Sequence, residues 1–158
     1  DFGIQTGPYM SLDCYREFYK PYHKKVNDWI HSHTKWKTFF HSCGAVADFL
    51  EDFHEIGVDI LNPVQLSAVG MDGKILKEKW GDKFVFWGGG VDTQKTLPFG
   101  TPEEVYREVT ERLELFSKGG GFVFNTIHNI QGNVPVKNLL AMFRAVEDFR
   151  DGEIRGRK

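Results

Sequence analysis

The chain alternates amphipathic helical segments with short apolar segments along almost its whole length. Apolar residues recur at three- and four-residue spacing, the period of a helix, within residues 11–33, 46–56, 71–80, 101–116 and 139–149. Continuous apolar runs, typical of strands buried on both faces, occupy residues 36–40, 58–61, 84–87 and 122–124. Helices that alternate with such strands predict an α/β fold whose parallel sheet is built from βαβ units.

Local signals mark where helices break, begin and end. Pro21 lies inside the first helical stripe and predicts a kink or break there, because proline lacks a backbone donor. Gly57 stands where a left-handed C-terminal residue belongs. Thr101, Pro102 and Glu104 have the spacing of a helix cap, a first-turn proline and a capping-box glutamate. These positions predict the bounds of the corresponding helices.

The 158 residues hold about four and a half βα units, because residues 1–3 resemble the end of a strand. A (βα)8 barrel needs about 200 residues or more, whereas an open doubly wound sheet can be complete at this length. We interpret residues 1–150 as one domain or part of one, and the charged residues 151–158 as a frayed tail. In a partial barrel, unpaired sheet edges and an apolar inner face would favour a missing N-terminal half-barrel or self-association.

Composition argues against several classes of partner. The net charge is -2, which gives no broad cationic field for nucleic-acid phosphates. Apolar runs stay short of the roughly 18 to 20 residues that span a bilayer, so we expect no membrane partner. The two cysteines are too few for a disulfide framework, and we expect free thiols and a cytoplasmic location.

Polar side chains follow every predicted strand. In a parallel α/β sheet the ligand lies beyond the carboxyl ends of the strands, so these positions are the candidate site. As catalytic groups we expect Asp1, Asn125 and His128, and as substrate-binding groups Gln5, Asn62, Gln65, Gly89 and Asp92. Glycines 88–90 lack the spacing of a Rossmann or Walker loop and are expected to let backbone approach a ligand. Asp92 can equally be a turn or helix-cap carboxylate.

His41 and Cys43 form the sharpest local feature. Side chains two residues apart in extended chain point to the same side, and imidazole with thiolate is a ligand pair suited to zinc. A buried structural cysteine beside a hydrogen-bonded histidine is an equally good interpretation. His128 could supply a third ligand and leave the fourth position open for substrate. It could instead donate to an anionic substrate without metal, or simply be a satisfied loop histidine.

At these residues the chain resembles the uroporphyrinogen decarboxylase superfamily. The resemblance covers nearly the whole chain, through residues 11–22, His-Ser-Cys-Gly at 41–44, Asn-Pro-Val-Gln at 62–65, residues 88–92 and 124–135. It implies the later strands of a (βα)8 TIM barrel with parallel strands. It also implies that a decarboxylase's catalytic aspartate and substrate-binding arginines would belong to the N-terminal half, outside this chain.

Two branches of the superfamily differ at informative positions. His41-x-Cys43-Gly44 resembles the corrinoid methyltransferase branch, where this pair binds zinc and a later cysteine completes the site. This sequence has no such cysteine, since its only other one is Cys14. The stretch at 124–129, with Asn125 and His128, instead resembles the Asn-Leu-Gly-His stretch of true decarboxylases, which need no metal.

The first functional hypothesis is therefore zinc-dependent methyl transfer, with His41, Cys43 and His128 as metal ligands. Its implied partners are a methylated corrinoid (methylcobamide) protein or a small-molecule methyl donor or acceptor. The alternative is a metal-free decarboxylase of a carboxylated porphyrinogen, with Asn125 and His128 in the pocket. A further hypothesis is a fragment or subunit that is inactive until it pairs with a second half-barrel.

Overall fold

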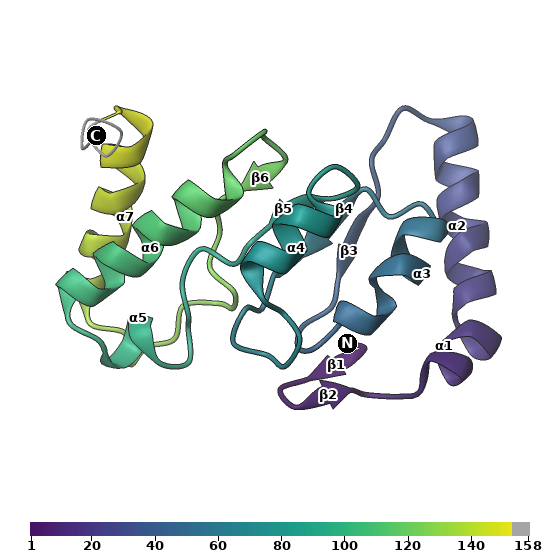
Figure 1. The fold of residues 1–158 in the computed structure, drawn as a ribbon, viewed down its shortest axis with the longest axis horizontal. Coiled ribbons are helices and arrows are strands. Elements are labelled where there is room, and N and C mark those ends of the chain that lie inside the picture. The colour runs from purple at the N-terminus through teal and green to yellow at the C-terminus, as the bar shows by residue number, and fades with distance from the viewer. Residues whose placement is uncertain (153–158) are drawn as a thin grey trace.

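A parallel sheet of four strands, in the order β3-β4-β5-β6, lies at the centre of the computed structural model, which describes residues 1–152 (Figure 1). The register pairs His41 with Asn62 across β3 and β4, and Trp87 with Val123 across β5 and β6. The prediction of an α/β fold with parallel strands is confirmed. The strands are β3 (Phe39–His41), β4 (Ile60–Asn62), β5 (Val85–Trp87) and β6 (Phe122–Val123).

Helices separate the strands as the hydrophobic periodicity predicts. Figure 1 shows α1 to α3 gathered near β3 at one end of the molecule, and α6 and α7 side by side at the other. None of the helices in residues 1–152 is both long enough and apolar enough to cross a membrane. The helices are α1 (Leu12–Phe18), α2 (Lys20–His33), a 3-10 turn (Ala47–Phe49), α3 (Leu50–Glu55), α4 (Gly73–Trp80), α5 (Thr96–Phe99), α6 (Pro102–Phe116) and α7 (Val136–Arg150).

The helix break, helix end and helix cap that the sequence predicts are all present in the structure. The first helical stripe breaks between α1 and α2, and Pro21 lies in the first turn of α2, where its missing N–H is not needed. Gly57 has a φ of 79° after α3. At the start of α6 the side chain of Thr101 accepts from the N–H of Glu104, whose carboxylate accepts from the N–H of Thr101.

The N-terminal segment differs from its prediction. Instead of ending a parallel strand, residues 1–8 form a short antiparallel pair of β1 (Gly3–Ile4) and β2 (Gly7–Pro8). The strand expected at residues 36–40 begins later, at Phe39, because the N–H of Thr38 donates to the Asp59 carboxylate at 2.8 Å. The frayed tail predicted for residues 151–158 lies mostly outside the described residues, since the description ends at residue 152.

Two apolar clusters stabilise the fold. The larger packs Phe53, Leu61 and Phe86 between the sheet and the neighbouring helices, and each of these side chains is fully buried. The smaller joins α6 to α7 through Val109 and Met142. Burial of such side chains contributes about 1.5 to 3 kcal/mol each. The sheet and its flanking helices therefore form a stable platform for the strand ends.

The opposite face of the sheet is only partly covered, which differs from the doubly buried strands that the sequence predicts. Phe39 is 50% exposed and packs edge-on against Trp87, with ring centroids 5.5 Å apart. Phe40, which points the other way on β3, packs in the larger cluster. Within residues 1–152, helices cover one face of the sheet and leave Phe39 on the other face half exposed, as expected for part of a closed barrel.

A buried carboxylate connects the N-terminal helices to α3. Asp52 accepts hydrogen bonds from Arg16 at 3.0 Å and from Lys20 at 2.6 Å, and Lys20 also bonds Glu55. Burial acts to raise the pKa of Asp52, but the hydrogen bonds from Arg16 and Lys20 outweigh it and hold the pKa below its usual value. This network fixes α1 and α2 against α3.

Candidate functional site

The carboxyl ends of the strands meet around one cavity of about 390 Å³, which we call the strand-end pocket. The segments that follow β3, β4, β5 and β6 all contribute to it, as does the N-terminal segment. This is the edge of the sheet at which the sequence predicts a site. The residues lining the pocket are Asp1, Gln5, Cys43, Gln65, Thr93, Gln94, Ile127, His128, Asn129 and Gln131.

His41, Cys43 and Asp1 form a compact cluster at one side of this pocket. One nitrogen, sulfur or oxygen atom from each lies within 4.8 Å of the others. Nε2 of His41 is 3.6 Å from Sγ of Cys43 and 3.8 Å from a carboxylate oxygen of Asp1. The expectation that the histidine and the cysteine point to the same side of the extended chain agrees with this geometry.

A close approach of two backbone segments brings Asp1 to Cys43. A Cβ at Gly3 would lie 2.6 Å from the backbone nitrogen of Ala45, and a Cβ at Gly44 would lie 2.4 Å from the carbonyl carbon of Gly3. Because both positions lack a Cβ, the segments can touch, and the N–H of Cys43 donates to the Asp1 carboxylate at 2.9 Å. Burial raises the pKa of the Cys43 thiol above its usual value, which favours the neutral thiol in the free protein.

The cluster's donor set fits a zinc ion. Imidazole nitrogen, thiolate sulfur and carboxylate oxygen are all zinc ligands, and bonds of about 2.0 to 2.3 Å place neighbouring ligand atoms of a tetrahedral site roughly 3.3 to 3.8 Å apart. The separations of His41 from Cys43 and from Asp1, 3.6 and 3.8 Å, fall in that range. Three protein ligands would leave a fourth position for a substrate.

His128 lines the strand-end pocket together with Cys43, although the two follow different strands. It lies outside the group of atoms within 4.8 Å, so in this structure Asp1, rather than His128, is the third side chain beside His41 and Cys43. Nδ1 of His128 is 3.2 Å from the carbonyl oxygen of Asn129, which can only accept, so Nδ1 donates. No residue among 1–152 bonds the other ring nitrogen, Nε2.

Of the three side-chain amides predicted to bind substrate, two line the pocket and one does not. Gln5 and Gln65 both line the pocket, and the buried Gln65 also accepts from the N–H of Gly44 at 2.8 Å. Asn62 does not line it and instead bonds Nδ1 of His41 at 2.6 Å. Gln65 and Asn62 thus support the segment that carries the cluster.

Three other predicted site residues do not line the pocket. The backbone carbonyl of Asn125 accepts from the N–H of Gly90 at 2.9 Å and so extends the ladder between β5 and β6. A Cβ at Gly89 would lie 2.9 Å from the carbonyl oxygen of Val64, so this glycine allows an approach of backbone to backbone. Asp92 accepts from the N–H groups of Gln94 and Lys95, as its interpretation as a turn carboxylate predicts.

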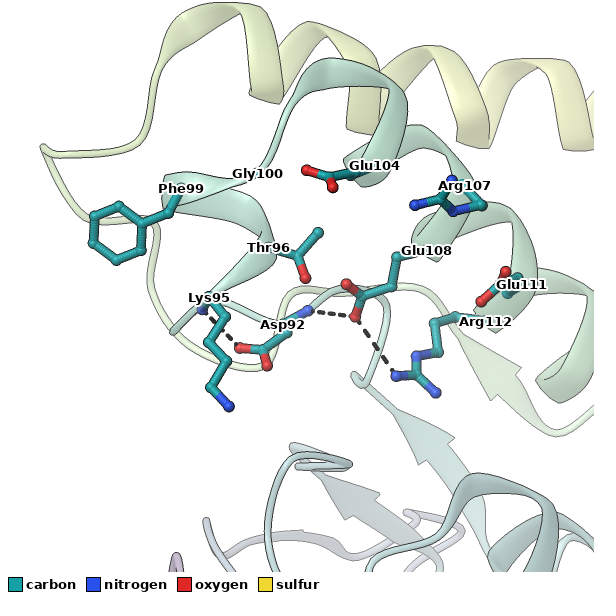
Figure 2. Close-up of a pocket in the computed structure, with 10 residues that line it drawn as sticks. All are labelled: Asp92, Lys95, Thr96, Phe99, Gly100, Glu104, Arg107, Glu108, Glu111 and Arg112. Atoms are coloured by element: carbon teal, nitrogen blue, oxygen red, sulfur yellow. Dashed lines mark hydrogen bonds and ion pairs between the residues drawn. The ribbon is translucent and has the colours of Figure 1, made fainter.

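A larger groove, of about 560 Å³, lies between α5 and the start of α6 and contains Asp92 (Figure 2). Two of its charged side chains, Glu108 and Arg112, pair with each other. Glu108 accepts from the N–H of Asp92 at 2.9 Å and lies 3.6 Å from Arg112, as the dashed lines in Figure 2 show. This groove is larger than the strand-end pocket, but its lining residues lie within 92–112 and do not come from several strand ends. We therefore place the candidate site in the strand-end pocket.

Sequence reasoning missed the pocket residues that lie in the loops rather than at the strand ends. Thr93 and Gln94 follow the glycine-rich exit of β5, and Asn129 and Gln131 follow His128. Their only sequence signal is their polarity within a few residues of a predicted site residue. Loop conformation decides which of them reach the pocket, and hydrophobic periodicity carries no information about it.

Comparisons with known proteins agree with this architecture. The model of the family described as "Uroporphyrinogen decarboxylase (URO-D)" matches residues 3–149. A uroporphyrinogen decarboxylase of Shewanella halifaxensis is 27% identical over 151 residues, which is 90% of this chain and 39% of that protein. One of Pseudomonas fluorescens is 30% identical over 147 residues, again 90% of this chain and 39% of that protein.

A uroporphyrinogen decarboxylase of Pseudoalteromonas translucida is 35% identical over 86 residues, 52% of this chain and 23% of that protein. The chain thus spans about two fifths of the length of the Shewanella and Pseudomonas relatives, whose matched share is 39%. The matched residues 3–149 include the whole sheet and all of the described helices except the last residue of α7. The chain therefore belongs to the uroporphyrinogen decarboxylase family.

Proposed function

We propose that the protein is a carboxy-lyase that removes carboxyl groups from a carboxylated tetrapyrrole, and that this chain supplies one side of its pocket. The relatives that match 90% of the chain are named uroporphyrinogen decarboxylases, which favours this activity over the methyl transfer expected from His41 and Cys43. The structural support is the strand-end pocket, where His128 and several side-chain amides surround one cavity.

The lining of the pocket suits a carboxylated ligand. The amides of Gln5, Gln65 and Gln94 can donate to carboxylate oxygens, and His128 can do so as an imidazolium. In decarboxylation the bond to the carboxylate carbon breaks, CO2 leaves, and a proton replaces it on the substrate. We assign to His128 the binding of a substrate carboxylate, and we propose that the charges driving bond cleavage come from the rest of the protein.

Turnover by metal-free protein tests this proposal. Full-length protein that contains this chain, stripped of zinc, should convert uroporphyrinogen, and His128→Gln should lower its kcat/KM by about 10- to 100-fold, the size expected for a lost charge-assisted hydrogen bond. His54→Gln is the matched control, because His54 is exposed on α3 and does not line the pocket. Equal activity of the two variants, or no turnover without zinc, would contradict the proposal.

A second candidate, zinc-dependent methyl transfer, is favoured by the cluster of Asp1, His41 and Cys43. These three side chains would hold the metal, which when bound acts as a Lewis acid and lowers the pKa of a coordinated thiol. The partner would be a methylated corrinoid protein or a small-molecule methyl donor or acceptor. In this case Asp1 and His41 position the metal, and the adjoining strand-end pocket provides space for the reacting groups.

Metal analysis separates the two candidates. Methyl transfer predicts bound zinc that is lost in Cys43→Ala and kept in Cys14→Ala, the variant at the other cysteine. Zinc content unaffected by Cys43→Ala would remove this candidate. Zinc-dependent demethylation of a methylated corrinoid, together with failure to convert uroporphyrinogen, would select it over the carboxy-lyase.

We further propose that the chain functions together with the rest of a barrel. Its sheet leaves Phe39 half exposed on the inner face, and Val136, Leu140 and Phe143 form an exposed apolar stripe on α7. A chain that matches 39% of its relatives' length and leaves such surfaces open would be inactive alone. Both cysteines are free in the structure, which suits the reducing cytoplasm that we propose as its location.

A further inference from the structure

The side-chain amide of Asn62 connects three neighbouring strand ends. Asn62 is the last residue of β4 and its side chain is nearly buried, with the residue 7% exposed. Its Nδ2 donates to the backbone carbonyl of Trp87, at the end of β5, over 2.7 Å. Its Oδ1 lies 2.6 Å from Nδ1 of His41, at the end of β3. The parallel register pairs His41 with Asn62, so the sheet itself produces this contact.

Hydrogen-bond chemistry fixes the orientation of this amide. The carbonyl of Trp87 can only accept, so the NH2 group of Asn62 must face it, and a flipped amide would bring two oxygens together. Oδ1 of Asn62 therefore faces His41. Because that oxygen can only accept, the contact of 2.6 Å requires a proton on Nδ1 of His41.

We propose that Asn62 is a positioning residue that holds the neutral ring of His41 in the tautomer with its proton on Nδ1. Nε2 then carries the free lone pair, and this atom lies 3.6 Å from Sγ of Cys43 and 3.8 Å from Asp1. A lone pair on Nε2 can bind a metal ion or accept a hydrogen bond from the thiol, whereas an N–H at Nε2 can do neither. The inference concerns the free protein and goes beyond both candidate functions.

Nitrogen NMR of the histidine ring in the full protein tests the tautomer directly, without any turnover. In the unsubstituted protein Nδ1 of His41 should show the shift of a protonated nitrogen and Nε2 that of an unprotonated one. Asn62→Leu removes the acceptor while keeping similar volume, so the ring should move toward the Nε2–H form that free histidine favours. Asn62→Asp keeps an acceptor beside Nδ1 and should keep the original tautomer.

Thr38→Val is the matched control, because it removes a hydrogen bond of a buried residue, and that bond does not involve His41. Thr38 is also 7% exposed and also bonds across the sheet, to the carbonyl of Gly57 at 2.8 Å, but it precedes the opposite end of β3. This variant should lower thermal stability and leave the nitrogen shifts of His41 unchanged. An Nε2–H ring in the unsubstituted protein, or shifts that do not differ between Asn62→Leu and Thr38→Val, would overturn the proposal.

Zinc affinity, measured by competition with a chromogenic chelator, provides a second readout that also requires no activity; this readout rests on the second candidate function, in which Asp1, His41 and Cys43 hold zinc. Loss of a hydrogen bond that orients a metal-binding histidine typically weakens the metal by about 10- to 100-fold. We expect that loss for Asn62→Leu, a smaller one for Asn62→Asp, and none for Thr38→Val. Equal affinity in all of these variants would contradict the role assigned to Asn62.

Discussion

The carboxylate of Asp1 accepts a hydrogen bond from the backbone N–H of Cys43 at 2.9 Å, although the two residues lie in different strand–helix units. This contact places the carboxylate 3.8 Å from the ring of His41. It exists because the backbone at Gly3 and Gly44 is in direct contact. The geometry of the candidate site therefore depends on two glycines, Gly3 and Gly44, which have no side chain to take part in the chemistry.

Substitution of Gly44 by alanine should distort this side of the pocket. Its φ is 83°, and an added Cβ would lie 2.4 Å from backbone of Gly3, which cannot move away as a side chain could. We expect a loss of about 1 to 3 kcal/mol in the free energy of unfolding, or more if the segments separate. Gly132→Ala is the control, since a Cβ there would meet no described atom within 4 Å. Urea unfolding that places both variants at equal stability would contradict the close approach.

Alkylation should show that Cys43 is a thiol in metal-free protein. Because burial raises its pKa, the thiolate form is scarce at neutral pH, and the rate of reaction with iodoacetamide should rise only above the pH range of an ordinary thiol. Mass spectrometry of the modified peptides over pH 7 to about 10 gives the profile. Cys14 provides an internal comparison in the same sample. A Cys43 profile lying at lower pH than that of an ordinary thiol would contradict the structure.

Asp52→Asn should lower stability and change its dependence on pH. Removing the charge that Arg16 and Lys20 bond should cost about 1.5 to 3 kcal/mol at neutral pH. The folded pKa of Asp52 lies below its unfolded value, so its contribution is full above about pH 4 and is lost as the pH falls through the folded pKa.

The stability difference between Asp52→Asn and the unsubstituted protein should therefore shrink on acidification, as followed by urea unfolding between pH 7 and pH 3. Asp48→Asn, at an exposed aspartate just before α3, should show neither the loss nor its pH dependence. A difference that grows as the pH falls would mean that Asp52 is not the stabilising carboxylate.

The exposed stripe on α7 should make residues 1–158 associate on their own. Val136, Leu140 and Phe143 are 70%, 64% and 56% exposed and lie on one face of the helix. Leu140→Glu should reduce the concentration-dependent increase in sedimentation coefficient, whereas Lys137→Glu, also exposed on α7, should not. A monomer at every concentration would count against the proposal that this surface needs a partner.

Much of the fold could be predicted because its signals are local. The helical stripes, the break near Pro21 and the capping box at Thr101 depend on neighbours in sequence, and all are confirmed. The start of β3 could not be predicted, because Asp59, from another unit, takes the N–H of Thr38. The short α5 was also not predicted, since it is only four residues long and contains Pro98.

For the site, the sequence could place His41 beside Cys43, because two residues of extended chain fix that relationship. It could not place Asp1 in the same cluster, which depends on a tertiary contact between backbones. Nor could it show that the backbone carbonyl of Asn125 extends the sheet or that Gly89 allows a close approach to Val64, because both contacts depend on the tertiary fold.

Short-span cross-linking tests most directly the claim that separate strand ends form one pocket. In a Cys14→Ser background, a short bis-maleimide should link Cys43 to a thiol introduced by His128→Cys, because both positions line the same cavity. The same reagent should not link Cys43 to a thiol introduced by His54→Cys on α3. Intramolecular linkage seen by mass spectrometry only with His128→Cys is the predicted result. Absence of that link, or equal linkage at both positions, would contradict the account.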